Sequence, residues 1–236
     1  MPYTELAATL QRRLALDIPP IALARVAESP SGVSRLETAV PSACAFWRRA
    51  EREVFYATAD DHFNCPIGAM VMGFPLPEAK SSELMGLVEQ MCALNYISMD
   101  EVPNIPAFRE PAAGIVYGPL AEFPIEPEVA LLWTTPVEAM LFEEAAGATA
   151  WTAQAAAAVF GRPGCSALPM AVSRGQVVTS LGCAGMRTYT GIPDDRFLVV
   201  IPGNRLPPLN DALTRTLVAN HQMREFYASQ KAKFPD

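Results

Sequence analysis

The sequence lacks the features that would direct a chain into or through a membrane. No stretch of about 18 consecutive apolar residues occurs, so we expect no membrane-spanning helix. The first residues, Met1 to Leu16, contain no positive region followed by an apolar one, which argues against a secretory signal peptide. These absences predict a soluble, cytoplasmic protein.

Positive charge is also scarce, which limits the classes of partner. The chain carries 18 Lys and Arg against 25 Asp and Glu, a net charge of −7, and it contains no basic run. It therefore lacks the electrostatic footprint of a nucleic-acid-binding or membrane-surface protein. No Gly-rich phosphate loop, HExxH motif or GxSxG motif is present, so nucleotide binding and serine-hydrolase chemistry have no support. The partners left open are a redox partner protein, a small-molecule substrate and a second copy of the chain.

The sequence does contain enough apolar residues for a large core. Hydrophobic residues fill 50% of the 236 positions and charged residues only 18%, which is typical of a folded protein. Short strand-like runs alternate with helical patterns, and this predicts an α/β fold with a mixed sheet and flanking helices. The expected strands are 21–27, 53–58, 114–120, 128–134, 176–180 and 196–201. The expected helices are 3–16, one that carries Cys44, 78–97, 136–146, 150–160 and 207–231, with a polar loop at 59–64.

The five cysteines are the residues that point to chemistry. In a reducing cytoplasm they serve as core residues, metal ligands or nucleophiles rather than as disulfides. Cys65 and Cys183 each begin the same pattern, Cys-x7-Gly-x-Pro, and each pattern follows a β-rich run. Another cysteine, Cys44 in one case and Cys165 in the other, lies before that run. The order strand, Cys, strand, Cys, Gly-x-Pro therefore occurs twice.

This repetition predicts two similar halves related by a pseudo-two-fold axis and packed as one compact unit. The halves are residues 1–111, with Cys44 and Cys65, and residues 112–236, with Cys165 and Cys183. Such an axis would bring the two pairs of cysteines together at the junction of the halves. Ligands commonly bind at junctions of this kind.

Four thiolates at one junction would complete an iron–sulfur or a zinc site. We expect an iron–sulfur cluster, most simply [4Fe-4S], with Cys44, Cys65, Cys165 and Cys183 as its ligands. The protein would then act in electron transfer or as an iron–sulfur-dependent oxidoreductase. The spacings of 21, 100 and 18 residues include no CxxC pair and match no ferredoxin or zinc-finger pattern. Three alternatives therefore stay open. They are a zinc-stapled or metal-free module that binds a small ligand, a thiol enzyme that uses Cys65, and buried cysteines without a ligand.

Four other side chains bear on this site. His62 lies three residues before Cys65 and is a candidate proton donor, thiol base or replacement ligand; a solvated loop residue is the alternative. Arg187 is the second candidate catalytic residue, and with Arg162 it would offset the negative charge of a thiolate-ligated cluster; surface arginines are the alternative. Cys92 lies on the apolar side of a helical pattern, so we expect it in the core.

The segments around these cysteines resemble an uncharacterised family of archaeal and bacterial proteins, the domain-of-unknown-function 169 group. The resemblance runs from Pro19 to Leu206 through PPIALA, CAFWRRA, FYATADDHFNCPIGA, IVYGPL, GRPGCSALPMA, SLGCAGMRTYTGI and VVIPGNRL. It implies no assigned reaction, metal or substrate. It does imply that the cysteine-containing segments are a hallmark of the family, which favours a thiol or metal site.

Overall fold

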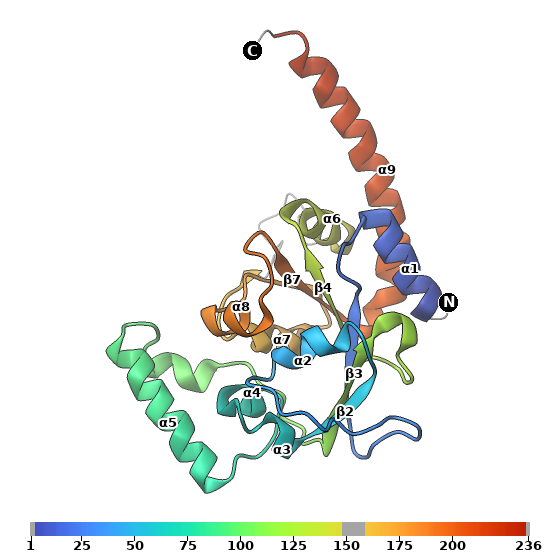
Figure 1. Ribbon diagram of the computed structural model, residues 1–236. Coiled ribbons are helices and arrows are strands. Elements are labelled where there is room, and N and C mark those ends of the chain that lie inside the picture. Colours follow the sequence, from blue (N-terminus) through green and yellow to red (C-terminus); the bar gives the residue numbers. More distant parts are fainter. Residues whose placement is uncertain (1–2, 148–158, 235–236) are drawn as a thin grey trace.

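One mixed sheet organises the molecule (Figure 1). The computed structural model describes residues 3–147 and 159–234, and within them the strands are β1 (Ile21–Val26), β2 (Phe55–Thr58), β3 (Gly114–Pro119), β4 (Val129–Thr134), β5 (Val159–Phe160), β6 (Val178–Ser180) and β7 (Phe197–Pro202). Their order in the sheet is β2-β3-β1-β4-β7-β6-β5. Neighbouring strands are antiparallel except β5, which runs parallel to β6. The predicted α/β class with a mixed sheet is confirmed.

Helices cover both faces of the sheet. The α-helices are α1 (Tyr3–Leu14), α2 (Ala45–Ala50), α3 (Ala59–His62), α4 (Pro66–Val71), α5 (Glu78–Ala93), α6 (Pro136–Ala146), α7 (Ala167–Arg174), α8 (Ala184–Thr190) and α9 (Leu206–Lys231). Short 3₁₀ helices are η1 (Met99–Asn104), η2 (Leu120–Glu122), η3 (Gly164–Ser166) and η4 (Gly203–Arg205). Helices α2, α4, α7 and α8 contribute to the core on one face, and α1, α6 and α9 to the core on the other.

The strands show why both faces need a helical layer. Side chains alternate between the two faces of a strand, so a strand that is apolar throughout must be covered twice. In β4, Val129 and Leu131 pack in the core beside α2 and α7, whereas Ala130 and Leu132 pack in the core beside α1, α6 and α9. Every residue of β4 is buried.

Local sequence sets where several helices begin and end. Leu6, Leu10 and Leu14 recur every fourth residue in α1, and all three are buried. Helix α6 begins with a capping box, in which the Glu138 carboxylate accepts from the Thr135 N–H at 2.7 Å.

No helix of the described residues combines the length and the apolar character that crossing a membrane requires.

Some predicted elements differ from the structure. The polar loop expected at 59–64 is wrong, because Ala59–His62 forms helix α3, where the Asp61 carboxylate accepts from the Thr58 N–H at 2.7 Å. The helix expected at 150–160 lies mainly outside the described residues, and its last two positions form strand β5. The short helices α4, α7 and α8 were not expected from the sequence. Helices of six to eight residues are stabilised mainly by tertiary packing, so their sequence signal is weak.

The strand order bears on the predicted halves. Strands β1 and β4 are antiparallel neighbours, β3 and β7 flank them, and β2 and β6 follow on either side. Strand β3 lies beyond the expected boundary at residues 111 and 112, yet it pairs with β1 and β2. Sheet pairing thus groups β1, β2 and β3 together, and β4, β6 and β7 together. The pseudo-two-fold relation stays a prediction, which superposition of residues 21–119 on residues 129–202 would test.

Candidate metal centre

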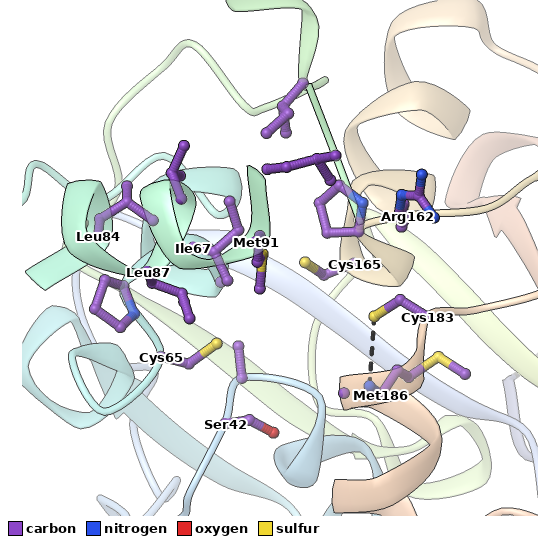
Figure 2. A pocket seen from close by; sticks show the side chains of 18 of the residues that line it. Ser42, Cys65, Ile67, Leu84, Leu87, Met91, Arg162, Cys165, Cys183 and Met186 are labelled. Carbon is purple, nitrogen blue, oxygen red and sulfur yellow. Dashed lines mark hydrogen bonds between the residues drawn. The ribbon is translucent and has the colours of Figure 1, made fainter. Parts of the chain in front are cut away.

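Four of the five cysteines line one pocket of about 750 Å³ on the α2, α4, α7 and α8 side of the sheet. They are the four that the sequence pattern singled out, namely Cys44, Cys65, Cys165 and Cys183. Figure 2 shows the sulfur atoms of Cys65, Cys165 and Cys183 directed toward the same space. Two of the four cysteines come from each predicted half of the chain.

Each of these cysteines lies at or near the start of a helix. Cys44, Cys65 and Cys183 are the N-cap residues of α2, α4 and α8. Cys165 lies in η3, which leads directly into α7. The first turn of a helix has backbone N–H groups without partners inside the helix, and such groups can donate to a sulfur. The Met186 N–H does so, donating to Cys183 Sγ at 3.4 Å.

Two glycines let the segments that carry the cysteines approach closely. A Cβ atom at Gly68 would lie 2.6 Å from the Cβ of Ala43 and 3.0 Å from the Sγ of Cys65. A Cβ atom at Gly164 would lie 3.0 Å from the Sδ of Met186. The absence of side chains therefore brings the Cys44 and Cys65 segments together, and likewise the Cys165 and Cys183 segments.

Burial strongly disfavours the charged form of two of the thiols. Burial raises the pKa of Cys44 to about 12. The Ser42 hydroxyl, whose Oγ lies 3.0 Å from Cys44 Sγ, lowers this pKa in part. The Cys65 and Cys183 thiols raise it further. The pKa of Cys165 lies well above its ordinary value, again chiefly because of burial and then because of the other three thiols. The four groups are thus close enough to influence one another. A metal would have to displace protons from Cys44 and Cys165 on binding.

The thiols are not gathered as tightly as a single metal ion requires. Within residues 3–147 and 159–234, no group of three or more His, Cys, Asp or Glu side chains is arranged to hold one metal ion. A tetrahedral zinc site has Zn–S distances of about 2.3 Å, which places its ligand sulfurs within about 4 Å of one another.

The opposite side of the pocket is an arm formed by α5 and η1, residues 78–104. Figure 2 shows Leu84, Leu87 and Met91 of this arm across the pocket from Cys183. Sequence reasoning missed the arm as part of the site. The available signal was the spacing of Leu84, Leu87 and Met91, which places them on one face of a helix.

A stacked pair joins the arm to the cysteine side of the pocket. The guanidinium carbon of Arg162 lies 4.5 Å from the centre of the Tyr96 ring, a cation–π contact. The Tyr96 hydroxyl also accepts from the Ala184 N–H at 3.4 Å, beside Cys183. Both Arg162 and Tyr96 line the pocket.

His62 is neither solvated nor part of the pocket lining, so the alternative of a solvated loop residue is wrong. It is 1% exposed, and its ring packs against Phe46 and Phe74. Its Nδ1 lies 2.6 Å from the carbonyl oxygen of Thr58, which can only accept, so Nδ1 carries the proton. Nε2 then accepts from the Tyr117 hydroxyl at 2.9 Å. Both ring nitrogens are engaged, which leaves His62 without a free position for a thiol or a metal.

We expect His62 to make the protein acid-sensitive. Burial lowers its pKa from 6.5 to about 4, against the opposing effects of the Thr58 carbonyl and the Asp61 charge. Between pH 6.5 and about 4 the unfolded chain binds a proton that the folded chain does not. Stability that is complete above pH 6.5 is therefore lost as the pH falls toward 4, by about 3 kcal/mol in all.

Denaturant unfolding of the wild type and His62→Gln at a series of pH values checks this expectation. Gln cannot titrate, so the variant should lose less stability between pH 6.5 and 4 than the wild type does. The same pH dependence in both proteins would contradict it.

Two other singled-out residues also lie outside the pocket lining. The Arg187 guanidinium donates to the carbonyl oxygens of Leu181 at 2.8 Å and Arg196 at 3.0 Å. It therefore links the backbone segments that precede and follow α8. Cys92 belongs to α5 and is half-buried, outside both core clusters, so its expected core position is wrong. Arg162, rather than Arg187, is the arginine beside the cysteines.

Comparison with known proteins assigns the chain to a family. The family model of DUF169, described as "Uncharacterised ArCR", matches residues 9–211. The chain belongs to the DUF169 family. This match spans all four pocket cysteines and confirms the resemblance found in the sequence. The chain is also 28% identical over 184 residues to Uncharacterized protein MJ0308 of Methanocaldococcus jannaschii, covering 70% of this chain and 72% of the relative. No solved structure matches the chain.

Proposed function

We propose that this DUF169 protein binds an iron–sulfur cluster and uses it in electron transfer or in the reduction of a small molecule. The ligands would be Cys44, Cys65, Cys165 and Cys183. The observation that carries the proposal is that these four residues, far apart in the sequence, line a single pocket while Cys92 does not. Burial of isolated cysteines in a core offers no reason for them to converge in this way.

The chemistry of the pocket favours a cluster over the alternatives. A polynuclear cluster takes one thiolate per iron and so holds its ligands further apart than a single zinc ion does. The described residues contain no group arranged to hold a single metal ion, so the arrangement of the thiols gives the zinc alternative no support. Thiol catalysis by Cys65 with His62 as base is less favoured, because both His62 nitrogens are engaged elsewhere.

The surroundings of the thiols could stabilise the charge of a cluster. Four thiolates and a [4Fe-4S]²⁺ core carry a net charge of −2, which a mostly apolar pocket would not tolerate without compensation. The Met186 N–H at Cys183 Sγ and the Arg162 guanidinium at the pocket lining would supply it. Free thiols also suit the reducing cytoplasm, the compartment that we propose for this protein.

Anaerobic purification, followed by metal and sulfide analysis, tests the proposal. We expect coloured protein with the broad visible absorption of an iron–sulfur cluster and about four iron and four sulfide per chain. Dithionite should bleach this absorption if the cluster is redox-active. If iron and sulfide do not bind, either on purification or after anaerobic reconstitution with ferrous iron and sulfide, the proposal is wrong. Colourless protein with about one zinc per chain would favour the zinc alternative.

A further inference from the structure

The pocket is large enough for a small organic molecule. Its volume of about 750 Å³ lies within the roughly 300–1,000 Å³ that is typical of small-molecule sites. The cysteines line one side, and the arm of residues 78–104 faces them. A cluster bound through the four sulfurs would occupy the cysteine side, so the space toward the arm stays open.

The open side presents an apolar surface. Leu84 is buried and Leu87 and Met91 are half-buried, one turn apart along the helix. Ile97, beyond the end of α5, also lines the pocket. Such a surface binds hydrocarbon or aromatic groups through the hydrophobic effect, which is roughly proportional to the apolar area removed from water.

The charges of the pocket lining single out Arg162. It is the one basic residue among the described residues that line the pocket, and within the described part of the chain its guanidinium contacts the Tyr96 ring but no carboxylate. Two of the three lining carboxylates are committed elsewhere. Glu83 pairs with Lys80 at 2.6 Å, and Glu101 accepts from the Ser98 N–H at 2.7 Å.

The third lining carboxylate, Asp100, is exposed, as Arg162 is, so water and salt screen both charges. Arg162 is the lining group that can hold an anion, because its planar guanidinium can donate two parallel hydrogen bonds to a carboxylate. The stacking on Tyr96 limits the orientations of the guanidinium in advance of binding.

We propose that the pocket binds a small organic anion, with an apolar body against Leu84, Leu87 and Met91 and a carboxylate on Arg162. The inference rests on the proposed cluster for the role of this molecule as a redox substrate, and not for its binding. The arm and Arg162 form the binding surface whether or not iron is present.

Three probes that share one apolar body test the proposal. Cinnamate, cinnamamide and cinnamylamine carry a negative, neutral and positive polar end, and their binding to the purified protein can be measured by calorimetry. We expect cinnamate to bind about tenfold more tightly than the amide, and the amine to bind most weakly, because a charged hydrogen bond distinguishes them. In Arg162→Gln the preference for the anion should disappear, while residual binding of the aromatic body persists.

A matched pair of variants on α5 tests the apolar wall. Leu87→Glu places a charge inside the pocket and should abolish binding of cinnamate. Met85→Glu changes an exposed residue of the same helix that does not line the pocket, and it should bind as the wild type does. Circular dichroism of both variants separates loss of binding from loss of folding.

The outcomes distinguish this inference from the cluster proposal. Protein that binds no iron even after reconstitution but prefers cinnamate through Arg162 supports the anion site, although the cluster proposal then fails. Iron-loaded protein that binds none of the probes overturns the anion site and leaves the cluster proposal intact. Equal binding of the three probes, or an undiminished anion preference in Arg162→Gln, also overturns it.

Discussion

Replacing Cys165 by Ser is expected to reduce bound iron from about four atoms per chain to less than about one. Cys165 is 9% exposed, and its sulfur is directed into the pocket (Figure 2). A serine hydroxyl is nearly isosteric with the thiol, but it does not ionise readily and is a poor ligand for iron. Iron and sulfide analysis after anaerobic reconstitution measures the effect.

Cys92→Ser is the matched control for this experiment. Cys92 carries the same functional group, but it lies on α5 and does not line the pocket. We expect its iron and sulfide content to equal that of the wild type. Loss of iron from Cys92→Ser, or full retention in Cys165→Ser, would mean that the ligand set is wrong. Because both changes are conservative in volume, a thermal unfolding scan of each variant should show an intact fold.

Gly203→Ala is expected to destabilise the protein by about 3 kcal/mol or more. Gly203 follows the end of β7, and its N–H donates to the carbonyl oxygen of Glu128 at 2.9 Å. A Cβ atom at this position would overlap the carbonyl oxygen of Pro127, which is backbone and cannot move aside as a flexible side chain can. The substitution must therefore separate the end of β7 from the start of β4, at the centre of the sheet.

The comparison with Gly86→Ala makes this expectation specific. Gly86 lies within α5, and a Cβ atom there would meet no heavy atom within 4 Å. Alanine favours the helix over glycine, so this variant should be more stable by roughly 0.5–1 kcal/mol. Urea unfolding of both variants, with unchanged dependence on denaturant, gives the two values. If Gly203→Ala unfolds at the same urea concentration as the wild type, the close approach has no energetic consequence.

That the four cysteines lie around one pocket could be anticipated, because two of them begin a repeated local pattern. Cys65 and Cys183 begin the same Cys-x7-Gly-x-Pro pattern, in which the cysteine precedes a short helix and a glycine with positive φ follows that helix. The other parts of the site have no such pattern. Arg162 and Arg187 look equivalent in the sequence, since each lies three or four residues from a cysteine, but only Arg162 lines the pocket.

The class of the fold, most of the strands and the grouping of the four cysteines could be predicted from the sequence. These depend on side-chain periodicity and on turn residues, which act over a few neighbouring positions. The strand order, the burial of His62 and the position of α5 across the pocket from the cysteines could be learned only from the three-dimensional structure. Each of these depends on which surfaces pack together over long sequence separations. The sequence of an apolar strand that is buried on both faces does not indicate which strands pair with it. A polar side chain such as His62 can be buried when hydrogen bonds to Thr58 and Tyr117 satisfy its two ring nitrogens.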